Sequence, residues 1–207
     1  MRINKKLKFV FISTPKACTH TIYNILEKHF SDGLLRAGFH NNQIVNSYQS
    51  YFRWTVVRNP FTRAVSIWWS ACRLAHLDQY KFRRLSGGQY DFTRFVVWMS
   101  GVSEARRNRE PLLMNQSDWL APVEPINALH LENLQEEIKY LSFWKDNIKI
   151  QRLNTTDEKI QTQSQLEGEQ ITKPSIKELY KDPEAVDAVL KWAGNDFSRF
   201  GYEKSVP

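Results

Sequence analysis

The chain has 207 residues, of which 42% are hydrophobic and 25% are charged, a composition that is ordinary for one globular domain. Its formal net charge of +7 favours an anionic partner, such as a nucleic acid, a lipid surface, or a phosphorylated or sulfated small molecule. Cys18 and Cys72 are the two cysteines, which excludes a disulfide scaffold and a cysteine-based zinc cluster.

The first half of the chain alternates predicted strands and helices. Residues 7–13 are a short apolar run rich in Val, Ile and Phe, typical of a buried strand, and a helical period begins at His20 after a tight turn. A short strand is expected at 34–39 and a second buried strand at 52–57. The next helix is expected over 61–75. A strand, a turn and a helix are the unit that opens many parallel α/β folds.

The second half is less regular. A helix is predicted between Asp91, a good N-cap, and Gly101. Residues 102–127 are polar and contain several prolines, which predicts a long functional loop. The remaining expected elements are a strand at 128–131, a helix at 133–144, an edge strand at 149–153, a mobile loop at 154–173, and a helix between Asp182 and Gly194. We expect one three-layer α/β domain over 1–207, with a central, mainly parallel sheet.

The sequence has no pattern typical of a membrane span or of an export signal. No run approaches the roughly 18 apolar residues of a membrane span. Residues 1–6 lead into a strand rather than into an apolar stretch with a small-residue cleavage site. We therefore expect a soluble, cytoplasmic chain without stable membrane insertion.

The turn between the first predicted strand and helix has the features of an anion site. Such a turn directs backbone N–H groups at one point, where the helix dipole also favours an anion. Lys16 adds a positive charge, and Thr19 and Thr21 add hydroxyl donors. The nucleotide-loop pattern GxxxxGK[ST] is absent, and residues 14–21 contain no glycine. A surface lysine without a ligand is the alternative interpretation.

A second anion site is predicted where strand 52–57 ends. Arg58 stands at the carboxyl edge of the sheet, where open α/β sheets bind ligands. Ser66 lies in the second turn of the following helix, so an arginine and a hydroxyl could clamp a second phosphate. A helix cap or a salt bridge is the alternative role for Arg58. Two separate anion sites suit a nucleotide that carries phosphates at two positions.

The two segments resemble the 5′-phosphosulfate and 3′-phosphate motifs of sulfotransferases, particularly of the carbohydrate sulfotransferase branch. The first motif, a hydrophobic strand followed by Pro-Lys and a hydroxyl-rich turn, is matched by residues 15–19. The second, a strand that ends in Val-Arg-Asn/Asp-Pro with a Ser in the next helix, is matched by residues 57–60 and Ser66. Residues 131–134 and 196–202 are similar to two further family segments, so the resemblance covers most of the chain.

The resemblance implies a P-loop-like sulfotransferase fold and a PAPS-dependent enzyme. Such an enzyme moves a sulfuryl group from 3′-phosphoadenosine 5′-phosphosulfate (PAPS) to a hydroxyl, here on a carbohydrate, and releases adenosine 3′,5′-bisphosphate (PAP) without a metal. Lys16 is the implied catalytic cation that stabilises the leaving oxygen. The implied donor-binding residues are Lys16, Ala17, Cys18, Thr19, His20, Thr21, Arg58 and Ser66. Two departures stand out: His20 replaces a Ser or Thr of many relatives, and Ala17-Cys18 replaces a glycine-containing pair.

A general base for the proton of the acceptor hydroxyl is expected among the five histidines. His40 is our choice, because it precedes the Arg58 strand, where the resemblance places a catalytic histidine. The alternative for His40 is an ordinary loop histidine. His20 fits a contact with the donor, and structural roles are expected for the others, which are His29, His76 and His130.

Residues 102–127 are expected to lie on the acceptor side. Trp119 belongs to this loop and is the candidate for stacking on a sugar ring, whereas Trp68, Trp69 and Trp98 have helical spacing and are expected in the core. The basic residues Arg106, Arg107 and Arg109 fit either an anionic glycan or a solvated surface.

Two other functions are alternatives to sulfuryl transfer. A nucleotide-dependent phosphotransferase would need a loop glycine, a Lys followed by Ser or Thr, and an acidic metal ligand at a strand end. A nucleic-acid-binding module would need a clustered basic patch or a known motif. The sequence supplies neither set convincingly, so no nucleic-acid partner is expected.

Overall fold

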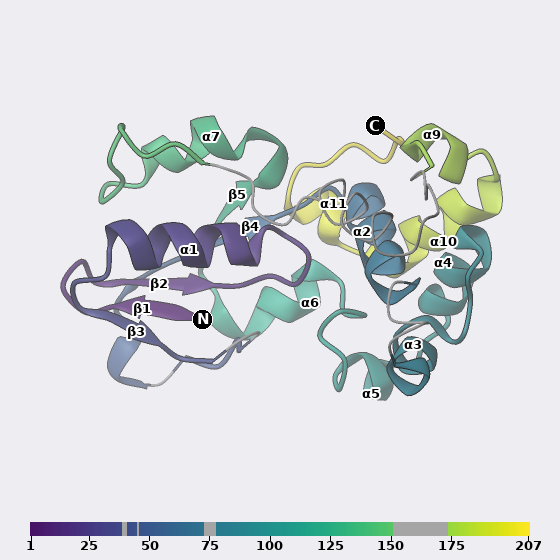
Figure 1. Ribbon diagram of the computed structural model, residues 1–207, viewed down its shortest axis with the longest axis horizontal. Coiled ribbons are helices and arrows are strands. Elements are labelled where there is room, and N and C mark those ends of the chain that lie inside the picture. The colour runs from purple at the N-terminus through teal and green to yellow at the C-terminus, as the bar shows by residue number, and fades with distance from the viewer. Residues whose placement is uncertain (39–40, 45, 73–77, 151–173) are drawn as a thin grey trace, which may run out of the picture.

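The computed structural model describes residues 1–38, 41–44, 46–72, 78–150 and 174–207. A five-stranded sheet, in the order β3-β1-β2-β4-β5, forms its centre (Figure 1). The strands are β1 (Arg2–Asn4), β2 (Phe9–Ile12), β3 (Leu34–Arg36), β4 (Phe52–Val57) and β5 (Asn127–His130). β2, β4 and β5 are mutually parallel, and β1 is antiparallel to β2 and to β3. The expected α/β fold with a central sheet between helices is confirmed.

Both faces of the sheet are covered, as the alternation along β2 requires. Phe9 and Phe11 point to one face, where they pack with helix α1 (Thr19–His29) and with apolar residues of the segment 134–148. Val10 and Ile12 point to the other face, against α6 (Gln116–Leu120) and its neighbours. All four side chains are fully buried, which explains why β2 is a continuous apolar run.

A group of helices forms a second core beside the sheet (Figure 1). Residues of this core come from α2 (Pro60–Cys72), α4 (Phe92–Ser100), α9 (Ile176–Leu179), α10 (Pro183–Ala193) and α11 (Asp196–Arg199). The helices α3 (Gln79–Ser86) and α5 (Glu104–Arg107) lie beside it. The expected caps Asp91 and Asp182 accept hydrogen bonds from the first turns of α4 and α10. Within the described residues, no helix combines the length and apolarity needed to cross a membrane.

Several element predictions are wrong. Residues 102–127 are not irregular, because they contain α5, α6 and the 3₁₀ turn Ala121–Val123. The helix expected at 133–144 is broken into the 3₁₀ turn Leu131–Asn133, α7 (Leu134–Glu137) and the 3₁₀ turn Ile138–Tyr140. Of the expected edge strand 149–153, residues 149 and 150 are not in a strand, and the others lie outside the described residues with the expected loop 154–173. The chain also has a 3₁₀ turn at Asn46–Tyr48.

Trp119 is a core residue rather than an exposed platform, so its expected stacking on a sugar ring is wrong. Its side chain is 4% exposed, and its indole nitrogen donates a hydrogen bond to the carbonyl of Ser13 at 3.2 Å. The prolines and polar residues around it suggested a loop, but α6 is held against the sheet by this ring and by Leu120.

Candidate functional site

The site begins where the parallel strands β2 and β4 end at one edge of the sheet. Thr14, which follows β2, and Thr55, which lies within β4, are hydrogen-bonded through their hydroxyl groups at 2.8 Å, and Thr55 also donates to the carbonyl of Ile12 at 2.7 Å. Both threonines are fully buried. The two predicted anion sites, which follow these strands, are therefore held side by side.

The turn after β2 adopts a left-handed backbone without glycine. Lys16 has φ 67° and Cys18 has φ 50°, conformations that cost about 1–2 kcal/mol for each non-glycine residue. Two hydrogen bonds to the carbonyl of Thr14 offset this strain. The Ala17 N–H donates one at 3.2 Å, and the Thr19 hydroxyl donates the other at 3.1 Å. The turn at the N-terminus of α1 is therefore tight, although Ala17-Cys18 stands where a glycine-containing pair was expected. Backbone strain of this kind is concentrated at functional sites.

Arg58 lies across this turn. Its Nε donates to the Thr62 hydroxyl at 2.9 Å, and its Nη1 reaches the carbonyl of Lys16 at 3.5 Å. The Arg58 side chain thus reaches the backbone of the turn that carries Lys16. Ser66 is half-buried on α2, one turn beyond Thr62.

Arg63, which the sequence analysis missed, ties the same turn to the helical core. Its Nε donates to the carbonyl of Pro15 at 3.0 Å and its Nη1 to the carbonyl of Met114 at 2.9 Å. The side chain is fully buried, and burial lowers the pKa of Arg63 to about 10. Its Nη2 has no hydrogen-bond partner among the described residues. A charged residue within the buried face of helix 60–72 was the signal available in the sequence.

A second network, also missed, holds the backbone of Arg58. The Arg58 N–H donates to Oε1 of Gln116, and Nε2 of Gln116 donates to the Arg58 carbonyl, both at 2.8 Å. The carboxylate of Asp196 accepts from the backbone N–H groups of Gln116 and Ser117 at 2.8 and 2.6 Å. Burial raises the pKa of Asp196, while the nearby charge of Arg63 acts in the opposite direction.

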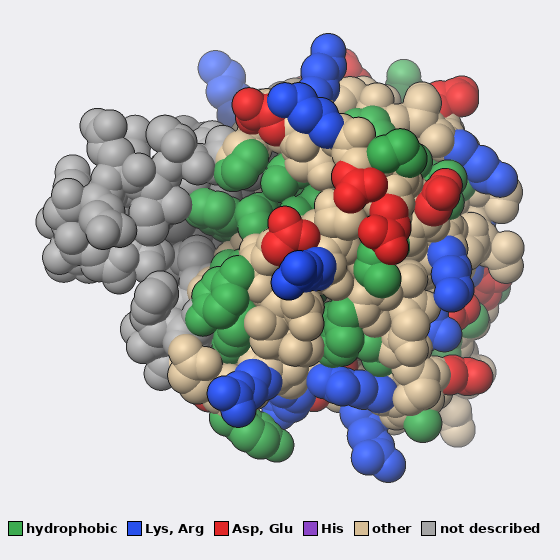
Figure 2. Space-filling model, turned by 90° about the vertical axis from the view of Figure 1, so that its right-hand side faces the viewer, with side chains coloured by type: hydrophobic (Ala, Val, Ile, Leu, Met, Phe, Trp, Pro, Cys, Tyr) green, Lys and Arg blue, Asp and Glu red, His purple; other side chains and the backbone are tan. Residues whose placement is uncertain are grey.

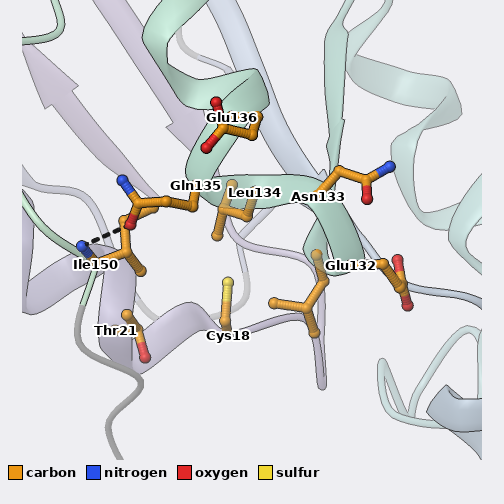
Figure 3. Close-up of a pocket in the computed structure, with 9 residues that line it drawn as sticks. Cys18, Thr21, Glu132, Asn133, Leu134, Gln135, Glu136 and Ile150 are labelled. Atoms are coloured by element: carbon orange, nitrogen blue, oxygen red, sulfur yellow. Dashed lines mark hydrogen bonds between the residues drawn. The ribbon is translucent and has the colours of Figure 1, made fainter. Parts of the chain in front are cut away.

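A pocket of about 210 Å³ opens beside the turn (Figure 3). Cys18 and Thr21 lie on one side, and the segment 131–136 lies on the other, with the Cys18 sulfur pointing into the space. Glu132 connects this wall to the Arg58 loop, because its carboxylate accepts from the Asn59 N–H and from the Tyr202 hydroxyl, both at 2.9 Å. The pocket is thus adjacent to both strand ends.

The structure describes three of the five histidines. His40, the predicted base, lies outside the described residues, as does His76. His20 is exposed on the first turn of α1. His130 has one ring nitrogen near the Glu137 carboxylate and the other 2.7 Å from the Phe200 carbonyl, which supports its structural role. Among the described residues, no cluster of three or more His, Cys, Asp or Glu is placed to hold a metal.

The basic residues of α3 and α5 lie at the far end of the helical group from the turn (Figure 1). Arg84 pairs with Glu110 at 2.9 Å, and Arg106 donates to the Arg84 carbonyl and packs over the Trp98 ring. Figure 2 shows this side of the molecule, where acidic and basic side chains are interspersed. Its charge is mixed, which fits a solvated surface.

The chain also matches a known protein family. A family model, described as Sulfotransferase family, matches residues 1–203. Comparisons with curated proteins and with solved structures gave no match. Since the family model covers almost the whole length, the chain belongs to the sulfotransferase family of transferases.

Proposed function

We propose that this sulfotransferase uses PAPS as its donor and a hydroxyl of a carbohydrate as its acceptor. The observation that carries the proposal is the approach of Arg58 to the carbonyl of Lys16 at 3.5 Å. This contact joins the two segments that are predicted to bind anions. A nucleotide with groups on both its 5′ and 3′ positions could bind to both segments at one edge of the sheet. The family supports sulfuryl transfer, and the resemblance of the two motifs supports the finer choice of donor and acceptor.

The residues around the turn fit such a donor. The N-terminus of α1 and the left-handed turn offer backbone N–H groups for the 5′-phosphosulfate, and Lys16 adds a charge. Arg58 and the half-buried Ser66 would hold the 3′-phosphate. The adjacent pocket, with Leu131 and Ile150 among its lining residues, would take the base. This assignment uses both sequence motifs and the pocket beside the first of them.

The donor supplies an activated sulfuryl group, and the protein supplies charge and proton acceptance. Lys16 would neutralise the negative charge that develops on the oxygen shared by phosphorus and sulfur as the S–O bond breaks. A base would take the proton of the acceptor hydroxyl while its oxygen bonds to sulfur. His40 remains our proposed base on sequence grounds, and the exposed His20 at the start of α1 is the next candidate.

Ligand-dependent thermal stability tests the donor assignment. PAP is expected to raise the melting temperature, because a ligand at about 100 times its Kd adds about 2.7 kcal/mol to the free energy of unfolding. Adenosine 5′-phosphate, which lacks the 3′ group, is expected to do so far less. Equal shifts from the two nucleotides would contradict the role of Arg58. A larger shift from ATP with magnesium would instead support a phosphotransferase.

A retention experiment separates the remaining alternative. The protein is expected to bind immobilised PAP and to be released by free PAP, but not by ATP or by duplex DNA. Release by DNA at equal charge concentration would favour a nucleic-acid-binding module. Acceptors can then be screened with PAPS that carries radiolabelled sulfur.

A further inference from the structure

We propose that Gln116 is a positioning residue for Arg58, fixed by the buried carboxylate of Asp196, and that it sets the recognition of the donor's 3′-phosphate. The inference rests on the proposed function, because it assumes that Arg58 binds this phosphate. Gln116 does not itself touch the donor. It acts through the backbone of Arg58.

The side chain of Gln116 provides the hydrogen bonds of a neighbouring strand at the point where the sheet ends. Val57 is the last residue of β4 and pairs with His130, the last residue of β5. The next peptide, at Arg58, therefore has no place in the ladder between those strands. The primary amide of Gln116 supplies both partners that a strand would have offered, since it accepts from the Arg58 N–H and donates to the Arg58 carbonyl at 2.8 Å each. This pair of bonds fixes the direction in which the Arg58 side chain leaves the backbone.

The orientation of the Gln116 amide is determined by its surroundings. Its nitrogen faces two acceptors, the Arg58 carbonyl at 2.8 Å and the Asp196 carboxylate at 3.3 Å, while its oxygen faces a donor. A flipped amide would set its oxygen against both acceptors and its nitrogen against the donor, so only one orientation satisfies all the groups. Asp196 is fully buried and also holds the Gln116 backbone N–H. Gln116 is fully buried as well, which makes this chain of contacts stiff.

The consequence for the donor is selective. Arg58 places its guanidinium between the Thr62 hydroxyl and the Lys16 carbonyl, so a small rotation of its backbone moves the charged group away from the turn. A displacement of about 1 Å is enough to lose much of a positioned interaction. The turn itself is held independently by Thr14 and Arg63. Loss of the Gln116 amide should therefore weaken recognition of the 3′-phosphate and spare recognition of the 5′ group.

The test is a double-mutant cycle on the full chain with two nucleotides as probes. Calorimetry gives the Kd of PAP and of adenosine 5′-phosphate for the wild type, Arg58→Ala, Gln116→Met and the double variant. The Kd of adenosine 5′-phosphate divided by the Kd of PAP measures recognition of the 3′-phosphate. Gln116→Met is expected to reduce this ratio about tenfold, because two buried hydrogen bonds are lost. It should cause no further loss in the Arg58→Ala background, because residues that act as one unit are not additive.

A matched variant controls for general destabilisation. Asn4 is also a fully buried amide that bonds to backbone groups, the Phe30 and Asp32 carbonyls and the Leu7 N–H, but it pairs with Phe9 at the opposite end of β2. Asn4→Leu is expected to lower the melting temperature and leave the ratio unchanged. If Gln116→Met does not fold, Gln116→Asn keeps the amide and shortens its reach by one methylene, and the same loss of ratio is expected.

The outcomes separate the two proposals. A folded Gln116 variant with the wild-type ratio, beside an Arg58→Ala variant that loses it, would overturn the positioning role alone. An unchanged ratio in Arg58→Ala would overturn the donor assignment itself. A further loss of ratio from Gln116→Met in the Arg58→Ala background would show that Gln116 acts by another route, and would also overturn the inference.

Discussion

Replacement of Arg63 by Met is expected to destabilise the protein modestly while it weakens donor binding. The substitution removes a buried charge, which by itself favours folding. Burial lowers the pKa of Arg63 from 12.5 to about 10, equivalent to about 3 kcal/mol. Against this, the carbonyls of Pro15 and Met114 each lose a donor, at about 1–3 kcal/mol each. The guanidinium also lies 5.1 Å from the centroid of the Trp192 ring, and loss of this contact costs about 1 kcal/mol more.

The balance of these effects is a loss of about 2 kcal/mol in the free energy of unfolding. For a chain of this size, that corresponds to a fall in Tm of about 4–8 °C, which scanning calorimetry measures directly. The affinities for PAP and for adenosine 5′-phosphate should fall together, because Pro15 precedes Lys16 in the turn that both nucleotides use. Arg63→Lys should restore neither property, since one ammonium group lacks the planar fork that serves two carbonyls. An Arg63→Met protein with unchanged Tm and unchanged nucleotide affinities would show that Arg63 does not hold the turn.

Three further predictions concern catalysis and pH. His40→Ala is expected to keep its affinity for PAP while turnover falls by about 10²–10⁴-fold; a fully active variant would direct attention to His20. Lys16→Ala should lose both donor affinity and turnover, and a change in turnover alone would limit Lys16 to the transition state. Burial raises the pKa of Cys72 to about 11 and also raises the pKa of Tyr180. The unfolded chain therefore releases these protons at lower pH, and urea denaturation should show the free energy of unfolding falling between about pH 9 and 10; a rising profile would contradict this.

The sequence predicted elements well where local signals agree. The limits of β4 are recovered residue for residue, because an apolar run ends at Arg58 and Pro60 begins the next helix. β1 was missed, since it has three residues of which only Ile3 is apolar. Helix α6 was missed for a different reason. It has five residues, and the carboxylate that holds its first N–H groups belongs to Asp196, far along the chain.

The site shows the same division. Lys16 and Arg58 could be chosen as candidates from the sequence because each follows a strand, and parallel strands bring their carboxyl ends together. Arg63, Gln116 and Asp196 were missed because their roles come from contacts between distant segments, which periodicity does not report. The similarity of residues 196–202 to a family segment did point to this region, and the structure gives it a physical role through Asp196 and Tyr202.

Transfer of radiolabelled sulfur from PAPS to a panel of hydroxyl-bearing glycans is the decisive experiment for the proposed activity. The expected result is label in at least one glycan, an equal amount of PAP released, and loss of both in Lys16→Ala and Arg58→Ala. Transfer that persists undiminished in both variants would contradict the site described here. Failure of PAPS to bind more tightly than ATP would contradict the proposed donor.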